Sequence, residues 1–236
     1  MSAAHPVTRA YRRRARTRSA LIIAARNLFG ERGIDAVTIQ DITDAADVGK
    51  GSFYYHFDSK EEVLQAAAED VLTQFAARLD RDFDDGDSDP AFVLGYSLYR
   101  TLRLCLDDPA IGRFVLRISD GVSLAEATIG QSARRDLLQG REAGRFVFDD
   151  VELVFTMITG GGIALLGRRL RDELTPAAVT GYVVSSLRFL GVPAPEAHRI
   201  ATEIEQRATP GRATQQAPDA EALPGSKATR SEARPD

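Results

Sequence analysis

Residues 38–62, TIQDITDAADVGKGSFYYHFDSKEE, decide how this chain of 236 residues folds. Apolar side chains recur at helical spacing over residues 39–46, and Thr38 stands at the position that caps a helix there. Residues 47–49 break this helix, and a second short helix is predicted over residues 50–56. Two short helices joined by so tight a turn form a helix-turn-helix unit.

A longer helix is predicted on each side of this unit. Over residues 17–33 the apolar side chains share one helical face, and Gly33 stands where the helix would end. Ser59 and Glu62 form a capping box at the start of another helix, whose apolar stripe runs to Leu79. The first third of the chain is therefore predicted to hold four helices.

The start of the second short helix suits a DNA groove. A helix that reads DNA enters a major groove about 12 Å wide with its first turn at the base edges, so that turn needs small or long polar side chains. Lys50, Gly51 and Ser52 meet this need, and Lys50 can reach a guanine edge or a phosphate. Gly51 costs about 1 kcal/mol of helix propensity, which only docking or packing would justify.

This stretch strongly resembles the DNA-binding domain of the TetR family of transcriptional regulators, from about Arg18 to about Val71. The resemblance implies phosphate contacts at Thr38, Tyr54, His56 and Lys60, and a base or sugar contact at Tyr55. It also implies a homodimeric repressor that binds a pseudo-palindromic operator in double-stranded DNA and is released by a small, largely apolar effector. The candidate DNA contacts are thus Thr38, Lys50, Gly51, Ser52, Tyr54, Tyr55, His56 and Lys60.

Taken singly, these residues also have plainer interpretations. Tyr54 can pack half-buried against its own helix, and His56 can bond between helices. Phe53 and Phe57, four residues apart, are expected in the core. Gly49 stands where the family commonly has a polar capping residue, so a looser helix start is expected.

Charge is distributed unevenly along the chain. The net charge of -4 and pI near 5.5 argue against a nucleic-acid binder. Residues 1–32, however, hold eight arginines and one acid, a balance of +7 that leaves -11 for the rest. We interpret the arginine-rich residues 9–18 as an arm for the minor groove or for phosphates, the alternative being a solubilising tail.

Six aspartates crowd the stretch from Asp80 to Asp89, which we interpret as the boundary between a small first domain and a larger second one. A calcium loop is the alternative, but Asp85 stands where its turn needs glycine and Ala91 where a bidentate glutamate belongs. Helical periodicity then continues to the end of the second domain, over residues 91–106, 111–118, 123–143, 150–170, 175–190 and 195–207.

The predicted fold class is all-α. An N-terminal three-helix helix-turn-helix domain is joined through a long helix to an all-helical domain for effector binding and dimerisation. The expected divisions are a disordered basic arm (1–16), the DNA-binding domain (17–70), the ligand-binding and dimerisation domain (71–207) and a disordered tail (208–236).

By the resemblance, the helices over residues 150–170 and 175–190 pair with their copies in a second subunit. Glycines 160, 161, 162 and 167 either allow close helix approach or mark a kink. An effector pocket would lie among the middle helices. The candidates for its wall are apolar and aromatic residues with a few cations: Tyr96, Tyr99, Arg103, Phe114, Arg117, Phe155 and Met157.

Other function classes find little support. The chain has no Gly-x-Ser-x-Gly, no His-Glu-x-x-His and no phosphate loop, so neither an enzyme nor a cofactor is expected. Cys105 and three scattered histidines fit no metal-ligand spacing. The uncharged run 153–167 is shorter than the roughly 20 residues of a membrane span. We expect a cytoplasmic protein; a helical adaptor or a nucleoid-type DNA binder without an effector is the alternative.

Overall fold

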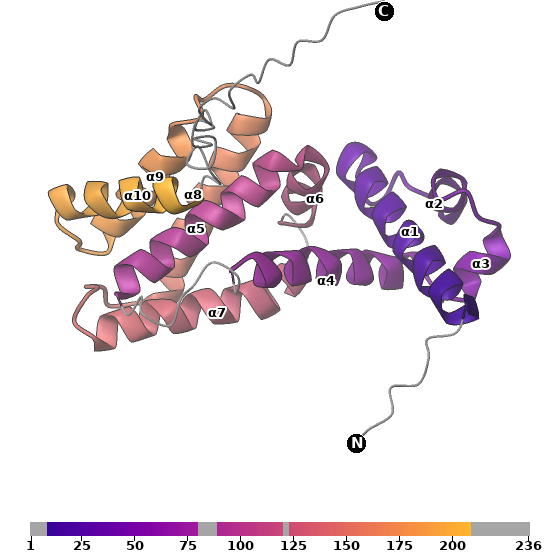
Figure 1. Cartoon of the computed structure of the whole chain (residues 1–236), viewed down its shortest axis with the longest axis horizontal. Helices are drawn as coiled ribbons and strands as arrows, with labels where there is room; N and C mark the ends of the chain where they lie inside the picture. The colour runs from indigo at the N-terminus through magenta and orange to yellow at the C-terminus, as the bar shows by residue number, and fades with distance from the viewer. Residues whose placement is uncertain (1–8, 80–88, 120–122, 209–236) are drawn as a thin grey trace, which may run out of the picture.

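A computed structural model describes residues 9–79, 89–119 and 123–208, and within them the secondary structure is helical with no strand. The all-α prediction is confirmed. Figure 1 shows α1 to α3 at one end of the molecule, α5 to α10 at the other, and α4 running between them. The helices are α1 (Arg9–Arg32), α2 (Ile39–Ala45), α3 (Lys50–Tyr54), α4 (Lys60–Leu79), α5 (Pro90–Asp107), α6 (Pro109–Ser119), α7 (Ser123–Glu142), α8 (Val151–Leu170), α9 (Ala178–Phe189) and α10 (Ala194–Ala208).

We call residues 9–79 the N-terminal unit and residues 89–208 the C-terminal unit. The predicted helix-turn-helix is present in the N-terminal unit as α2 and α3. At the end of α2, the Val48 N–H donates to the Thr43 carbonyl, and Asp47 takes a left-handed backbone with φ 53°. This motif stops α2 and turns the chain into α3 within three residues.

The start of α1 corrects the sequence prediction. We expected residues 1–16 to be a disordered arm, but α1 begins at Arg9 and its first turns carry the arginine run. Arginine and alanine are good helix formers, and the helix continues without a break into the apolar residues that pack against α4. Residues 1–8 lie outside the described residues. The end of α1 is as predicted, since Gly33 follows Arg32 with φ 85°.

The helices of the C-terminal unit begin and end close to their predicted bounds. The largest difference is at α9, which begins at Ala178 because residues 175–177 form a turn before it. Residues 80–88, where we predicted the domain boundary and weighed a calcium loop, lie outside the described residues, as does the predicted tail from residue 209.

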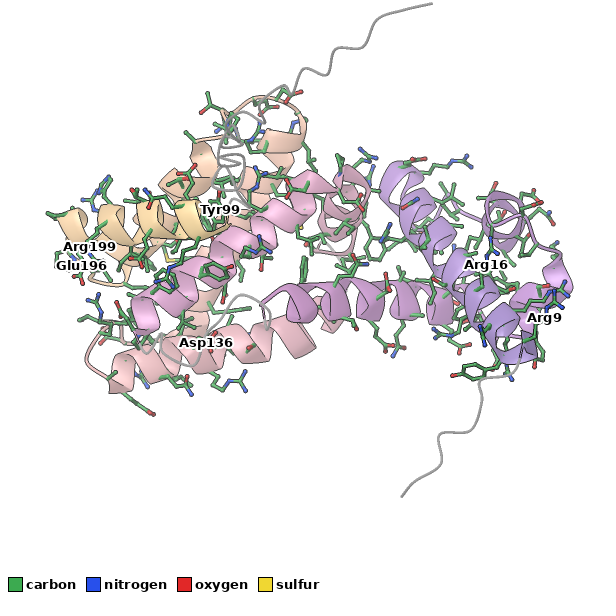
Figure 2. All side chains as sticks on the ribbon, viewed as in Figure 1. Arg9, Arg16, Tyr99, Asp136, Glu196 and Arg199 are labelled. Atoms are coloured by element: carbon green, nitrogen blue, oxygen red, sulfur yellow. The ribbon has the colours of Figure 1, made fainter. Side chains whose placement is uncertain are left out.

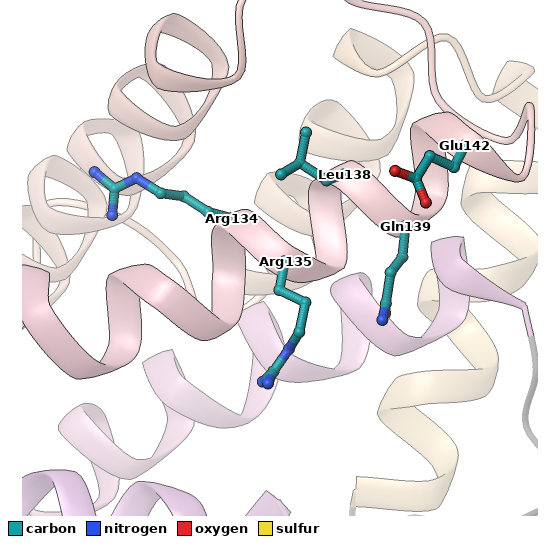
Figure 3. A pocket seen from close by; sticks show the side chains of 5 residues that line it. All are labelled: Arg134, Arg135, Leu138, Gln139 and Glu142. Carbon is teal, nitrogen blue, oxygen red and sulfur yellow. The ribbon is translucent and has the colours of Figure 1, made fainter.

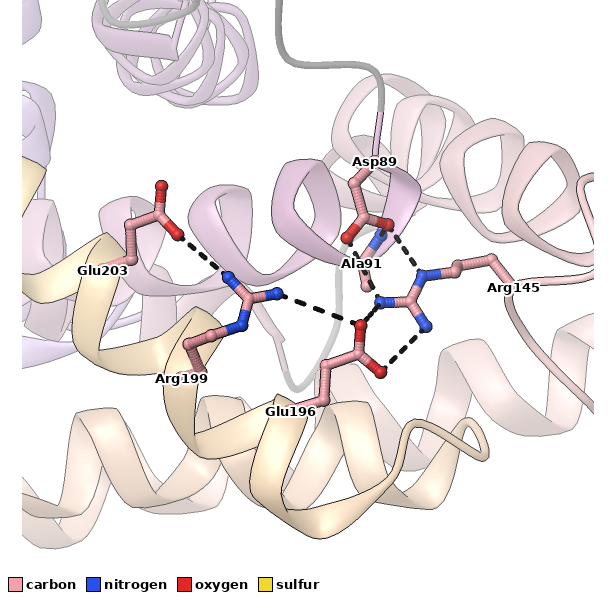
Figure 4. A network of polar contacts seen from close by, with 6 residues as sticks. All are labelled: Asp89, Ala91, Arg145, Glu196, Arg199 and Glu203. Carbon is pink, nitrogen blue, oxygen red and sulfur yellow. Dashed lines mark hydrogen bonds and ion pairs between the residues drawn. The ribbon is translucent and has the colours of Figure 1, made fainter.

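Asp89, the last of the aspartates in that stretch, has a structural role. Its carboxylate accepts the Ala91 N–H at the start of α5 and the Nε–H of Arg145 at 2.8 Å. Arg145 also pairs with Glu196 of α10, and Glu196 lies 3.9 Å from Arg199. Figure 4 shows this network, which ties the start of α5 to the segment before α8 and to α10.

The contact between α1 and α6 joins the two units. A Cβ at Gly30 of α1 would lie 2.9 Å from the backbone nitrogen of Phe114, so glycine permits this close approach. One turn earlier, Arg26 is buried, and its guanidinium lies 3.9 Å from the carboxylates of Asp70 on α4 and Asp108 before α6. A buried cation therefore sits between carboxylates of both units.

Two glycines of α8, Gly161 and Gly162, pack against α9 within the same chain, whereas Gly167 lies near Leu116 of α6. A Cβ at Gly162 would lie 3.1 Å from the hydroxyl of Tyr182, and that hydroxyl donates to the Ile158 carbonyl at 2.6 Å. Gly161 also faces the Tyr182 ring, whereas Gly160 faces open space. Among the described residues, α8 is the one helix long and apolar enough to cross a membrane.

Candidate nucleic-acid interface

The exposed side of α3 carries most of the candidate DNA contacts. Lys50 and Gly51 are exposed, and Tyr54 and Tyr55 expose 56% and 61% of their surfaces. Phe53 is fully buried and its ring meets the Tyr54 ring edge-on, with centroids 5.6 Å apart. A buried aromatic thus supports an exposed one, so Tyr54 is presented to solvent rather than packed away.

The backbone at the start of α3 is open. Gly49 is the N-cap with φ -74° and makes no side-chain cap hydrogen bond, as the sequence predicted. A Cβ at Gly49 or Gly51 would meet no atom within 4 Å. Neither backbone angle nor packing inside the described chain therefore explains the glycine at position 51.

Thr38 lies exposed at the start of α2 and forms a reciprocal cap. Its hydroxyl oxygen accepts the Asp41 N–H at 3.2 Å, and the Asp41 carboxylate accepts the Thr38 N–H at 2.8 Å. Hydrogen bonds from Thr38, with the nearby charge of Arg32, lower the pKa of Asp41. The cap fixes the orientation of the α2 N-terminus beside α3.

Lys60 lies differently from the other candidates. It is half-buried, and its Nζ donates to the carbonyls of Ile34 and Val37 at 3.0 and 3.2 Å. Both carbonyls belong to the loop between α1 and α2. The ammonium therefore holds this loop in place.

His56 is half-buried at the end of the aromatic run. Burial lowers its pKa, and the positive charges of Arg14 and Arg18 lower it further. Both effects favour the neutral form of the ring in the free protein, and a neutral ring can donate one hydrogen bond to a phosphate.

Two arginines of the stretch 9–18, which the sequence analysis assigned as a group to the minor groove or to phosphates, lie beside the aromatics that follow α3. The guanidinium carbon of Arg14 lies 4.5 Å from the centroid of the Tyr55 ring, and that of Arg18 lies 5.1 Å from the centroid of the Phe57 ring. Their spacing of four residues on a helix is the sequence signal that could have assigned both arginines to one face.

The seven candidate effector contacts differ in how far they are buried. Tyr96, Tyr99, Phe114 and Phe155 are buried, and Arg134 covers the Phe155 ring with its guanidinium carbon 3.9 Å from the centroid. The other three lie nearer the surface. Arg103 is half-buried and pairs with Asp107, Arg117 is exposed, and Met157 is 52% exposed.

A pocket of about 460 Å³ opens instead on α7. Figure 3 shows its lining, which comes from one stretch of this helix: Arg134, Arg135, Leu138, Gln139 and Glu142. Asp136 on the same helix is half-buried, and burial raises its pKa. In Figure 2, Asp136 and Tyr99 lie on different helices, α7 and α5. None of these α7 residues was among the sequence candidates, because helical periodicity does not show which faces enclose a cavity.

Comparison with protein families covers both units. The family described as bacterial regulatory proteins, tetR family, matches residues 21–67, and a second family, tetracyclin repressor-like C-terminal domain, matches residues 89–203. The chain belongs to the TetR family. The first match spans the second half of α1, all of α2 and α3, and the start of α4, so the helix-turn-helix lies within the part that matches the family.

Curated relatives are repressors of the same family. The KstR2 repressor of Rhodococcus jostii is 44% identical over 62 residues, 25% of this chain and 30% of the relative. The IcaR negative regulator of Staphylococcus epidermidis is 38% identical over 65 residues, 28% of this chain and 35% of the relative. The chain thus spans about a third of the length of these relatives.

Solved structures match over both units. RolR in complex with resorcinol is 37% identical with a TM-score of 0.62, covering 81% of this chain and 95% of that one. A gamma-butyrolactone receptor is 25% identical with a TM-score of 0.61, covering 82% and 98%.

Proposed function

We propose that this TetR-family chain is a homodimeric repressor that binds a pseudo-palindromic operator in double-stranded DNA and is released by a small-molecule effector. The exposed side of α3 carries the proposal, because Lys50, Gly51 and two exposed tyrosines there rest on a buried aromatic support. One helix of this length reads few base pairs, and a two-fold dimer presents two of them. We place the protein in the cytoplasm, where it meets the chromosome, and assign it no catalytic role.

An exposed apolar surface on α8 and α9 supports the dimer. Leu153 and Met157, one turn apart on α8, are 58% and 52% exposed, and Ile163 and Phe189 are also exposed. Large apolar side chains exposed on α8 and α9 are typical of helices that pack against a second subunit. Met157, a sequence candidate for the effector pocket, is thereby reassigned to the contact between subunits.

Two solved relatives indicate the chemistry of the effector. RolR is seen with resorcinol, and another relative is a gamma-butyrolactone receptor. Both names describe small ring compounds that carry oxygen. We therefore propose a small ring compound with one or two polar groups, bound within residues 90–190, which is more polar than the largely apolar effector expected from the sequence.

The junction between α1 and α6 supplies a route from effector to DNA in addition to α4. Because α6 packs on α1 as well as on α5 and α8, a shift of α6 changes the position of the helix that carries the reading surface. Arg26 faces carboxylates on both sides of this junction. A hundredfold loss of operator affinity needs about 2.7 kcal/mol of coupling, which lies within the usual allosteric range.

Mobility shift with genomic fragments around its own gene tests the proposal. We expect one or a few fragments to shift as a two-fold complex, and size measurement to give a dimer at micromolar concentration. If the protein shifts all fragments equally, a nucleoid-type DNA binder is favoured. If it shifts none, a helical adaptor that does not bind DNA is favoured. Resorcinol and a gamma-butyrolactone are the first effectors to titrate, and by reciprocity operator DNA must weaken effector binding by the factor by which effector weakens operator binding.

A further inference from the structure

We propose that Arg14 and Arg18 of α1 bind the DNA phosphates beside α3, and that Lys60 is a positioning residue for the loop before α2 rather than a phosphate contact. The inference rests on the proposed DNA-binding function. It names the cations that act at that surface, and it reverses the role that the family resemblance implies for Lys60.

The N–H groups of both arginines are available while each guanidinium lies over an aromatic ring. Arg14 and Arg18 are exposed and share one face of α1, and each places its guanidinium against a ring, of Tyr55 and Phe57 respectively. Within the described residues neither guanidinium has a hydrogen bond or an ion pair, so the N–H groups of both are available to a ligand. Those N–H groups match two phosphate oxygens at once, and the ring restricts the side chain before it binds.

The charge of the two arginines is not balanced by a carboxylate within the part of the chain that the structure describes. Arg145, by comparison, is engaged by two carboxylates and Arg134 by one. The pKa of His56, which lies between the two stacked rings in sequence, is lowered partly by both arginines, so their positive field reaches the aromatic surface. A polyanion placed against this surface would supply the missing counter-charge.

Lys60 is already engaged by the protein. Its Nζ donates to two backbone carbonyls, of Ile34 and Val37, and the second of these residues directly precedes the cap Thr38. Removal of the ammonium would free the loop that sets the start of α2. Lys60 therefore acts on DNA binding through the position of α2.

Arg16 offers a matched control on the same helix. It is exposed like Arg14 and Arg18, but a step of two residues turns it about 200° around the helix from each of them. Arg16→Gln removes the same charge from the same two helical turns without touching the face beside α3. It separates a phosphate contact from a general loss of positive charge.

The experiment measures operator affinity of the full-length dimer at several salt concentrations. Each phosphate contact contributes about 0.9 to the slope of log affinity against log salt, so Arg14→Gln or Arg18→Gln should flatten the slope by about 1.8, one contact in each subunit. Arg16→Gln should change the slope by less than half as much. Lys60→Gln should weaken affinity and lower the melting temperature while keeping the wild-type slope.

Two results would overturn the inference: slopes for Arg14→Gln and Arg18→Gln equal to that of Arg16→Gln, or a Lys60→Gln slope as flat as theirs. In either case the wild-type protein still binds its operator, so the proposed function stands. A wild-type protein that binds no genomic fragment overturns both proposals. Equal melting temperatures for the three arginine variants would show that a difference between their salt slopes does not come from a difference in folding.

Discussion

Glycine serves opposite purposes at the start of α3 and at two packed positions of the C-terminal unit. In the C-terminal unit, a Cβ at Gly112 would overlap the Cys105 carbonyl oxygen, and one at Gly140 would overlap the Phe146 ring. In the N-terminal unit, a Cβ at Gly49 or Gly51 would enter open space. At Gly112 the missing side chain lets α6 approach α5, and at Gly140 it makes room for the Phe146 ring of the following segment. At Gly49 and Gly51 it leaves an outer surface bare.

This difference shows where each unit does its work. In the proposed function the N-terminal unit acts through its outer surface. Its important positions are therefore ones where the fold itself does not need a particular side chain. The C-terminal unit acts through the relative placement of packed helices, since α6 contacts α1, α5 and α8. Glycine-to-alanine substitutions therefore test the two units separately.

The largest effect is expected from Gly112→Ala. The added methyl group would overlap the Cys105 carbonyl oxygen and lie 3.0 Å from Leu170, so α6 must move away from α5 and α8. Overpacking of this kind costs roughly 1–3 kcal/mol. Thermal denaturation of the full-length protein should show a melting temperature lower by several degrees, and an unchanged melting temperature would show that α6 has room to shift.

Gly51→Ala should leave the fold intact and damage DNA binding. The alanine meets no neighbour within 4 Å, and it improves helix propensity by up to about 1 kcal/mol. A methyl group between the α3 backbone and the DNA should weaken operator affinity about tenfold, roughly 1.4 kcal/mol. Titration with labelled operator and a parallel thermal scan measure both. Equal operator affinity would mean that the α3 backbone does not approach the DNA.

The helices of both units could be predicted from sequence because their signals are local. Thr38 and Gly33 mark helix ends by their own chemistry, and the helical spacing of apolar residues predicts helices wherever they pack. The start of α1 was missed because an arginine run has no apolar face, yet it continues a helix that is already nucleated.

The two candidate sites, the α3 surface and the effector pocket, differ in how well the sequence predicts them. The α3 surface is built from consecutive residues, so a local motif locates it. The interior of the C-terminal unit depends on which faces of α5, α7 and α8 meet, and periodicity does not carry that information. For the same reason Arg26, an arginine within an apolar stretch, signals a buried charge but not its partners Asp70 and Asp108.

A smaller effect is expected from acid on the network of the C-terminal unit. The hydrogen bond from Arg145 is the main cause that lowers the pKa of Asp89. A carboxyl whose folded pKa is depressed contributes stability above its unfolded pKa, near 4, and that stability is lost as pH falls through the folded pKa. Asp89→Asn should therefore lower the melting temperature near pH 6, and should lower it less as the pH falls below 4. An equal decrease in melting temperature at both pH values would mean that the charge of Asp89 does not cause the stabilisation.

The pKa of Asp136, in the same unit, is shifted in the opposite direction from that of Asp89. Burial raises its pKa, so the folded state holds the proton more tightly than the unfolded chain does, and stability is lost as pH rises from the unfolded pKa through the folded one. Asp136→Asn should accordingly raise the melting temperature near pH 7 and leave it almost unchanged near pH 3. Lower stability near pH 7 would show that the carboxylate has a favourable partner.

The smallest effect is expected from deletion of residues 209–236. This segment has four prolines, two glycines and one large aliphatic residue, Leu223, so it has little to bury in return for ordering. Operator affinity and stability should change by less than about 0.5 kcal/mol. A deletion that begins at Ile204 is the control, because Ile204 is fully buried and its Cδ1 would lie 3.0 Å from a Cβ at Gly95. That longer deletion should lower the melting temperature by several degrees; a comparable loss from the shorter one would mean that the segment packs on the rest of the protein.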